Sequence, residues 1–263
     1  MPSALTIAAT GMAAQQLNVE VLANNIANLN TTGFKRQRVA FEDLLYQERG
    51  VAVGTRTSEQ GSVAPSGVQV GVGVKPAGVY RIHAQGSLVG TENPLDIAVN
   101  GRGYFQITLP SGETGYTRAG SFQLSPTGEI VTPEGYQLQP GFTVPVDAKQ
   151  ISVSEQGVVQ VQIDGQIQPV EAGRISLTTF PNDAGLQAVG GNYYKETPAS
   201  GTPSQGSPGD PGFGVIRQGF LEASNVDIVS EITTLIAAQR AYEMNSKVIQ
   251  ASDEMLRSTS QMR

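Results

Sequence analysis

The sequence predicts an α+β protein with a long helix at each end and an all-β region, sandwich-like or barrel-like, between them. Residues 3–28 contain one Gly and no Pro, and residues 224–263 contain neither, so both ends can form uninterrupted helices. Both ends also carry apolar residues at heptad spacing. Almost all of the Gly and Pro lie in the segment between them, where apolar and polar residues alternate and turn sequences recur.

The composition limits the classes of protein to consider. The chain has 263 residues, of which 39% are hydrophobic, so it can bury a core and is not expected to be disordered. Its net charge of −6 and its charged fraction of 15% argue against nucleic-acid binding, which requires a concentrated basic surface. Because the sequence has no cysteine, it can form neither a disulfide nor a thiolate metal site.

The distribution of apolar residues predicts no membrane insertion. No apolar run approaches the ~20 residues of a membrane-spanning helix. The first basic residue is Lys35, and Gln15, Gln16, Asn18 and Glu20 interrupt any apolar segment before it. A secretory signal peptide needs a basic start followed by an apolar run, so we expect any export to proceed without a cleaved signal peptide.

The N-terminal helix is predicted from a narrow apolar stripe. After Ser3, a suitable N-cap, apolar residues recur every seven positions, with a second row offset by three. The stripe residues that we select are Leu5, Met12, Val19, Leu22 and Ile26. Ala, Thr, Asn and Gln flank the stripe instead of charged residues, which suits close packing on several sides. Residues 28–33, Asn-Leu-Asn-Thr-Thr-Gly, end the helix because Asn and Gly accept the left-handed conformation.

The C-terminal helix is predicted to begin after Ser224 or Asn225 and to carry a similar stripe. Its stripe residues are Ile228, Ile232, Leu235, Tyr242, Ile249 and Leu256. Asp253 and Arg257 have the i,i+4 spacing that stabilises a helix by ~0.3 kcal/mol. A helix over residues 226–257 would be roughly 45 Å long, which exceeds the diameter of a small domain. The two stripes fit either helices packed on their own sheet or helices that pack against copies of the chain.

The central region is predicted to consist of short strands. Alternating apolar and polar residues occupy 104–109, 121–124, 129–131, 158–163 and 174–180, and Gly- or Pro-containing turns separate many of these runs. Before them, residues 47–67 form either a flexible linker or a long hairpin, and their Val residues favour the hairpin. We therefore divide the chain into an N-terminal helix (1–33), a connecting segment with an extended hairpin (34–66), a central β domain (67–219) and a C-terminal helix (220–263). The two helices are expected to form a coiled-coil-like inner domain.

The sequence contains no motif that indicates an enzyme. His83 is the only histidine, and the residues near it do not form a metal-binding or catalytic pattern. Gly71-Val72-Gly73 and Gly101-Arg102-Gly103 lack the spacing and the lysine of phosphate-binding loops. We therefore expect no catalytic residue, no cofactor and no metal. Two alternatives are a secreted β-rich carbohydrate-active enzyme, which would need a cleft with carboxylates, and a β-rich binding module, which would not need two long helices.

Near the N-terminus, residues 23–28 are Ala-Asn-Asn-Ile-Ala-Asn and residues 30–35 are Asn-Thr-Thr-Gly-Phe-Lys. These segments, and others near the C-terminus, resemble signatures of the bacterial flagellar rod and hook family. At the C-terminus they are residues 219–227 and 239–247, and the central segment 93–105 is also similar to the family. The motif residues are Asn24, Asn25, Asn28, Thr32, Gly33, Phe34, Gln239, Arg240, Ala241 and Tyr242.

Within the family, the segment 41–47 followed by a Gly-rich insertion is similar to distal-rod members, whereas Thr6 lies where the family usually has an aromatic residue. The resemblance implies a structural subunit that polymerises helically into the distal rod, encloses the export channel and transmits torque from motor to hook. It also implies that both helices line the channel, and that residues 46–70 form a hairpin reaching neighbouring subunits. A hook or proximal-rod relative is the alternative within the family.

The same resemblance implies partners and a location. The expected partners are copies of this chain, proximal rod proteins, the hook protein, the surrounding outer-membrane and peptidoglycan ring proteins, and the flagellar type III export apparatus. The expected location is the periplasm-spanning rod of the basal body. Neither nucleic acid nor a membrane is an expected partner.

Overall fold

The computed structural model describes residues 2–48, 69–145, 147–163 and 168–261. The chain groups into two compact units. The helical unit comprises Met1–Ile26, Gln37–Tyr80 and Ile228–Arg263, and the β unit comprises Ala27–Arg36 and Arg81–Asp227. The predicted α+β class, with a helix at each end and a β-rich region between them, is confirmed.

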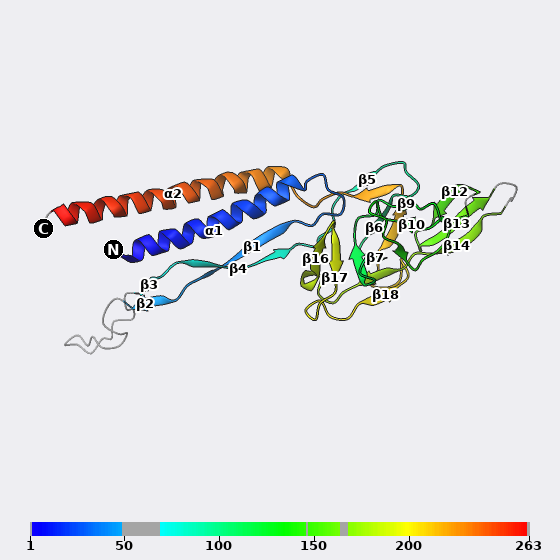
Figure 1. Cartoon of the computed structure of the whole chain (residues 1–263), viewed down its shortest axis with the longest axis horizontal. Coiled ribbons are helices and arrows are strands. Elements are labelled where there is room, and N and C mark those ends of the chain that lie inside the picture. Colours follow the sequence, from blue (N-terminus) through cyan, green and yellow to red (C-terminus); the bar gives the residue numbers. More distant parts are fainter. Residues whose placement is uncertain (1, 49–68, 146, 164–167, 262–263) are drawn as a thin grey trace, which may run out of the picture. The chain divides into compact units, whose positions relative to one another are not determined.

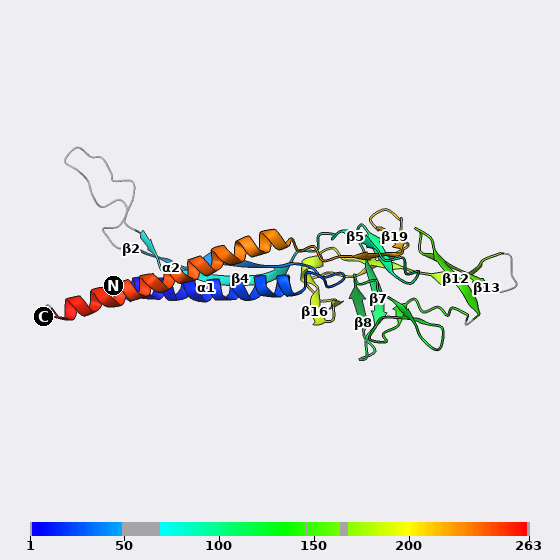
Figure 2. The same cartoon turned by 90° about the horizontal axis from the view of Figure 1, so that it is seen from above.

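Two antiparallel helices, α1 (Pro2–Ala27) and α2 (Ile228–Gln261), lie side by side in the helical unit (Figures 1 and 2). α1 begins at Pro2, one residue before the predicted cap Ser3. α2 begins later than Ser224 or Asn225 because the Asn225 side chain is used elsewhere, donating to the carbonyl oxygens of Ile82 at 2.8 Å and Ala84 at 2.9 Å. The tertiary contacts of Asn225 therefore accompany the later start of α2.

The described residues of this unit also form four strands. They are β1 (Gln37–Asp43), β2 (Tyr46–Glu48), β3 (Gln69–Gly71) and β4 (Val74–Arg81). β1 pairs with β4, and β2 pairs antiparallel with β3, Tyr46 lying opposite Gly71. The pairing thus groups residues 69–80 with the helical unit, although the sequence placed them in the central β domain. The part of the predicted hairpin over residues 49–68 lies outside the described residues.

The β unit is built from short, mostly antiparallel strands. Its first strands are β5 (Leu88–Gly90), β6 (Ile97–Asn100), β7 (Tyr104–Thr108), β8 (Thr114–Thr117), β9 (Gln123–Leu124), β10 (Ile130–Val131) and β11 (Leu138–Gln139). Then follow β12 (Ala148–Val153), β13 (Val158–Ile163), β14 (Val170–Arg174), β15 (Leu177–Thr179), the 3-10 turn η1 (Asp183–Gly185), β16 (Gln187–Gly190), β17 (Tyr193–Lys195), β18 (Ser204–Gly206), β19 (Val215–Gln218) and β20 (Phe220–Glu222).

The largest sheet has seven strands, in the order β16-β17-β8-β7-β15-β18, with β11 also paired to β7. A three-stranded sheet follows the order β12-β13-β14, and two-stranded ladders join β9 to β10, β19 to β6 and β20 to β5. Alternation explains the strand faces, since Val159 and Val161 of β13 are buried while Gln160 and Gln162 between and beside them are exposed. β13 therefore presents one apolar face to the interior, whereas β7 and β17 are buried on both faces, with Phe105 and Tyr193 in the main cluster and Tyr104 and Tyr194 in a second, aromatic one.

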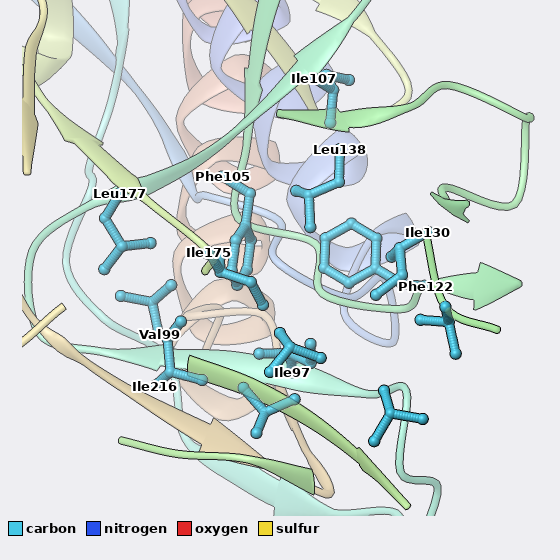
Figure 3. Packing of buried hydrophobic residues seen from close by; sticks show 14 of the residues in the cluster. Ile97, Val99, Phe105, Ile107, Phe122, Ile130, Leu138, Ile175, Leu177 and Ile216 are labelled. Carbon is cyan, nitrogen blue, oxygen red and sulfur yellow. The ribbon is translucent and has the colours of Figure 1, made fainter. Parts of the chain in front are cut away.

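That interior is a cluster of aliphatic and aromatic side chains, shown in Figure 3. Phe105 from β7 meets Phe122 edge to face, with 5.2 Å between ring centroids. Ile97 and Val99 from β6 converge on the same region as Ile216 from β19. All of the buried members of the cluster lie between Ile97 and Ile216, so neither end of the chain contributes to this core.

Candidate assembly surface

The faces that the two helices bury are made largely of small and polar side chains. Buried residues of α1 include Ala8, Ala14, Val21, Leu22 and Asn25, and the buried residues of α2 are Glu231, Ala238 and Ser252. At Gly11 the backbone of α1 approaches α2 so closely that an added Cβ would lie 2.8 Å from Asn245 Nδ2. Small residues permit this close approach, but they bury little apolar area.

The structure separates the predicted stripe residues into two groups. Leu22 is buried, and Leu5, Met12, Val19, Ile26, Leu235 and Ile249 are half-buried. The others, Ile228, Ile232, Tyr242 and Leu256, are exposed on α2. A single heptad row of α2 therefore does not form the contact with α1, because the half-buried Leu235 and Ile249 alternate along it with exposed side chains.

Five further exposed apolar residues of α2 lie outside the selected stripe residues. Val229 is 71% exposed and Met244 is 59% exposed, and Ile236, Val248 and Met255 are also exposed. Together with the four exposed stripe residues, they give α2 nine large apolar side chains in contact with solvent. Runs such as Ile228-Val229 place apolar residues on adjoining faces of the helix, which was the signal in the sequence. A helix with this much exposed apolar surface is typical of an interaction site.

A hollow in the helical unit adjoins this surface. It has a volume of about 340 Å³ and is lined by Gln16, Val19, Glu20, Gln239, Tyr242 and Glu243. Val19 and Tyr242 supply apolar area, and the carboxylates of Glu20 and Glu243 stand at the same hollow. Of the C-terminal motif, Gln239, Arg240 and Tyr242 are exposed and Ala241 is half-buried. The motif therefore lies largely on surface that other molecules can reach.

The N-terminal motif performs a different task, which centres on the fully buried Asn25. Its Nδ2 donates to Glu231 Oε2 at 3.0 Å and to the Gln37 carbonyl at 2.8 Å, and its Oδ1 accepts from the Gln37 amide at 2.9 Å. Asn25 thereby connects α1, the start of β1 and the first turn of α2. Asn24 is exposed, and Asn28 accepts through its Oδ1 from the Thr31 hydroxyl at 3.1 Å.

The rest of the N-terminal motif lies in the β unit. The Thr32 carbonyl accepts from Asn192 Nδ2 at 2.9 Å, and the Gly33 amide donates to the Glu222 carbonyl at 2.8 Å. Gly33 has φ +69°, and a Cβ there would lie 2.8 Å from the Ala119 backbone nitrogen, so both conformation and space require glycine. Phe34 is buried, and its carbonyl is 3.5 Å from the Asn225 amide. The two terminal signatures thus meet in space.

A buried cluster of charges joins the same segments, and sequence reasoning did not find it. Lys35 Nζ donates to Glu222 Oε1 at 2.6 Å, and Arg118 Nε lies 3.6 Å from Glu222 Oε2. All three side chains are at most 5% exposed. Both Lys35 and Glu222 belong to the terminal signatures, but their separation of 187 positions gives no local sign of pairing.

His83 packs in an aromatic cluster of the β unit. Its Nδ1 is 2.8 Å from the Tyr104 hydroxyl, and its ring meets Tyr104 and Tyr194 edge to face. Burial, reinforced by the positive charges of Lys35, Arg81 and Arg118, lowers the pKa of His83 to about 4, so the imidazole is neutral at pH 7. Within the described residues, no group of three or more His, Asp or Glu is placed to hold a metal ion, and no helix is long and apolar enough to cross a membrane.

Comparison with known proteins covers both ends and the centre of the chain. Residues 5–35 match the model for flagella basal body rod proteins, and residues 217–262 match the model for the C-terminal region of flagellar basal body rod FlgEFG proteins. Residues 98–161 match the model for the D1 domain of flagellar hook protein FlgE/F/G. These regions contain the two signatures that the fold brings together, and they place the chain in the class of structural proteins of the bacterial flagellum.

Full-length relatives agree with this class. The chain is 58% identical to the flagellar basal-body rod protein FlgG of Caulobacter vibrioides and 48% identical to that of Buchnera aphidicola subsp. Baizongia pistaciae, covering 99% of both chains in each case. It is 34% identical to FlgF of Caulobacter vibrioides, covering 98% of this chain and 96% of the relative. The chain belongs to the flagellar basal-body rod and hook family, and its strong full-length likeness is to FlgG members.

Proposed function

We propose that this chain is a structural subunit of the bacterial flagellar basal body that polymerises helically into the distal rod, encloses the export channel and transmits torque from motor to hook. The observation that supports self-assembly most directly is the exposed apolar surface of α2. The likeness to FlgG proteins over the whole chain supports the rod as the place of assembly.

The energetics of α2 favour coverage by further subunits. Nine large apolar side chains are each roughly half exposed, and burying the remainder is worth about 1 kcal/mol apiece. The gross gain, on the order of 10 kcal/mol, is comparable to the entropic cost of associating two molecules. One contact is then marginal, whereas several neighbours around each helix make a stable polymer. Because α2 contacts α1 mainly through small and polar side chains, its large apolar side chains remain available to neighbouring subunits.

A second copy of this chain is the occupant that we assign to the surface. A face of one subunit that binds a different face of the next gives a heterologous contact, which builds a helical filament when it does not close. The hollow at Val19 and Tyr242 is a candidate for the complementary face. In this arrangement the terminal helices form a coiled-coil-like inner layer, as proposed for the stripe and motif residues.

The remaining parts have corresponding roles in the proposal. We assign the β-rich region from residue 81 to residue 219, as a sandwich-like or barrel-like domain, to the outside of the rod. We assign residues 34–66, together with β3 and β4, which pair with β2 and β1, to a connecting segment whose hairpin contacts neighbouring subunits. A two-stranded ribbon is marginal alone, and exposed Phe41, Tyr46 and Tyr80 give β1, β2 and β4 apolar surface for such contacts. The proposed role is structural and includes no catalysis and no cofactor.

The proposed partners follow from a periplasmic rod. They are copies of the chain, proximal rod proteins, the hook protein, the outer-membrane and peptidoglycan ring proteins around the rod, and the type III export apparatus. We place the subunit in the basal body after export without a cleaved signal peptide.

The test is polymerisation of a variant whose exposed face is charged. Val229→Asp changes a side chain that is 71% exposed, so the subunit should fold normally while polymerisation falls at least tenfold, because a buried carboxylate at the subunit contact is costly. Gln250→Asp is the matched control on an exposed polar position of the same helix. Sedimentation measures polymer, and electron microscopy shows its form.

Normal polymers from Val229→Asp would contradict the assigned surface. Straight, rigid tubes from the wild-type chain support the distal rod, whereas flexible supercoiled tubes favour a hook relative. A monomer that never polymerises at any concentration would remove the self-assembly proposal.

A further inference from the structure

We propose that Lys35, Arg118 and Glu222 form a buried charge cluster that acts as a latch. The latch holds the first and last segments of the β unit together, and it closes only when both segments are in place. It can open without unfolding the core of that unit. The latch sets the assembly-competent state of the subunit. Only this last consequence rests on the function proposed above.

The latch is centred on the Glu222 carboxylate, whose side chain is fully buried. Oε1 accepts from Lys35 Nζ at 2.6 Å and from the Gly86 amide at 2.9 Å. Oε2 faces Arg118 Nε at 3.6 Å, and Arg118 Nη2 donates to the Gly101 carbonyl at 2.7 Å. One carboxylate therefore holds three separate segments of the chain.

Further hydrogen bonds connect residues 33–36 and 84–87 with each other and with the segment that carries Glu222. The Gly33 amide donates to the Glu222 carbonyl at 2.8 Å, and the Ala223 amide donates to the Ser87 carbonyl at 2.8 Å. Lys35 Nζ also donates to the Ala84 carbonyl at 2.9 Å. Residues 33–36, 84–87 and 222–225 are thus joined around Glu222, and the removal of any one leaves polar groups of the other two without partners.

The charges allow the latch to close only when the segment that carries Glu222 is present. The cluster holds two cations and one anion, and burial lowers the pKa of Lys35 below its usual range even with the Glu222 carboxylate beside it. Without Glu222, Lys35 and Arg118 would be two like charges in a buried site, a much larger cost than that of a missing hydrogen bond. Residues 33–36 consequently cannot stay docked until the segment that carries Glu222 arrives.

The latch is separable from the core. The main apolar cluster extends from Ile97 to Ile216 and includes neither Lys35 nor Glu222. A segment held mainly by polar contacts can open locally while the apolar core stays packed. Because Lys35 follows α1 and Glu222 precedes α2 in the chain, an open latch frees the two segments that lead to the helices.

Hydrogen exchange of the full-length chain tests the latch. In Glu222→Gln, the amides of Gly33, Gly86 and Ala223 should exchange roughly a hundredfold faster or more, because breaking a buried ion pair carries a large penalty. The amides of core strands β7 and β13 should keep their wild-type rates. The matched control is Glu155→Gln, which removes an exposed carboxylate 3.9 Å from Arg217 and should change none of these rates.

A charge-free triple variant makes the test independent of whether Glu222→Gln folds. Lys35→Met with Arg118→Met and Glu222→Leu removes all three charges of the cluster and replaces them with apolar side chains, and it should restore protection at Gly33 to within tenfold of wild type. Unchanged exchange in Glu222→Gln, an equal rise throughout the core, or a triple variant that is unprotected or unfolded would each overturn the latch.

A separate measurement addresses assembly. Sedimentation should show that Glu222→Gln polymerises at least tenfold less than wild type and that the charge-free triple variant recovers. If wild type itself does not polymerise, the proposed function fails while the exchange result still decides the latch. If wild type polymerises and Glu222→Gln does so equally well despite an open latch, the link to assembly is overturned.

Discussion

Replacing Asn25 by alanine should loosen the helical unit where α1, β1 and α2 meet. Asn25 is completely buried and makes three hydrogen bonds, two to the backbone of Gln37 and one to the Glu231 carboxylate. Alanine fits the space and favours the helix, so the loss is confined to these bonds. Each broken bond to a buried partner costs about 1 kcal/mol, which gives a loss of about 3 kcal/mol in the free energy of unfolding.

Chemical denaturation followed by helical circular dichroism measures this loss, and hydrogen exchange at Gln37 locates it. Asn30→Ala is the matched control, since Asn30 is an exposed asparagine shortly after α1 and its replacement should cost less than about 0.5 kcal/mol. Asn25→Asp should cost more than Asn25→Ala, because it replaces the donor to Glu231 with a second carboxylate. An Asn25→Asp variant as stable as wild type would refute this reasoning.

Three further outcomes are expected from the β unit. The pKa of His83 is about 4 in the folded protein and 6.5 in the unfolded chain, so the unfolded chain binds the proton first as the pH falls. The free energy of unfolding should therefore drop by about 3 kcal/mol between pH 6.5 and 4. His83→Gln should flatten this pH dependence in denaturation curves, and an unaltered slope would contradict the assignment. Gly33→Ala should lower the melting temperature more than Gly112→Ala, because both glycines have positive φ but only Gly33 has backbone atoms within 4 Å of the added Cβ. Equal decreases in melting temperature would show that the close approach of the Ala119 backbone does not matter. Phe122→Ala should cost about 3–5 kcal/mol in urea unfolding through loss of its packing on Phe105, and a loss below about 1 kcal/mol would mean that the core closes around the gap.

The two helices were predictable from sequence because their signals are local. Freedom from Pro, sparse Gly and regular apolar spacing determine where a helix forms, and α1 and α2 lie where these features predicted them. The same spacing did not predict which face each helix buries. Ile228 and Ile232 are exposed while Glu231 between them is buried, because hydrogen bonding to Asn25 outweighs the preference of apolar residues for the interior. Periodicity also cannot distinguish a face covered within the subunit from one available to neighbours.

The charge cluster could not be predicted for a related reason. Lys35 and Glu222 are each ordinary charged residues in their own surroundings, and only the fold brings them within 2.6 Å. The strands of the β unit were predicted in kind because alternation and turns are local signals, yet their order depends on pairing between distant segments, such as β15 with β7. β4 pairs with β1 instead of joining the central strands, so its place in the fold was also set by a distant partner. The self-assembly and motif residues remain predictions.

The confinement of the apolar core to residues 97–216 has a consequence for damaged chains. A subunit cut after Gln218 keeps every side chain of that core, but it lacks Glu222 and all of α2. Such a fragment would keep its packed core but lose the nine exposed apolar side chains of α2. In the proposed polymer, truncated subunits therefore lack the α2 contacts that hold a subunit in place, so the polymer excludes them without a separate selection step.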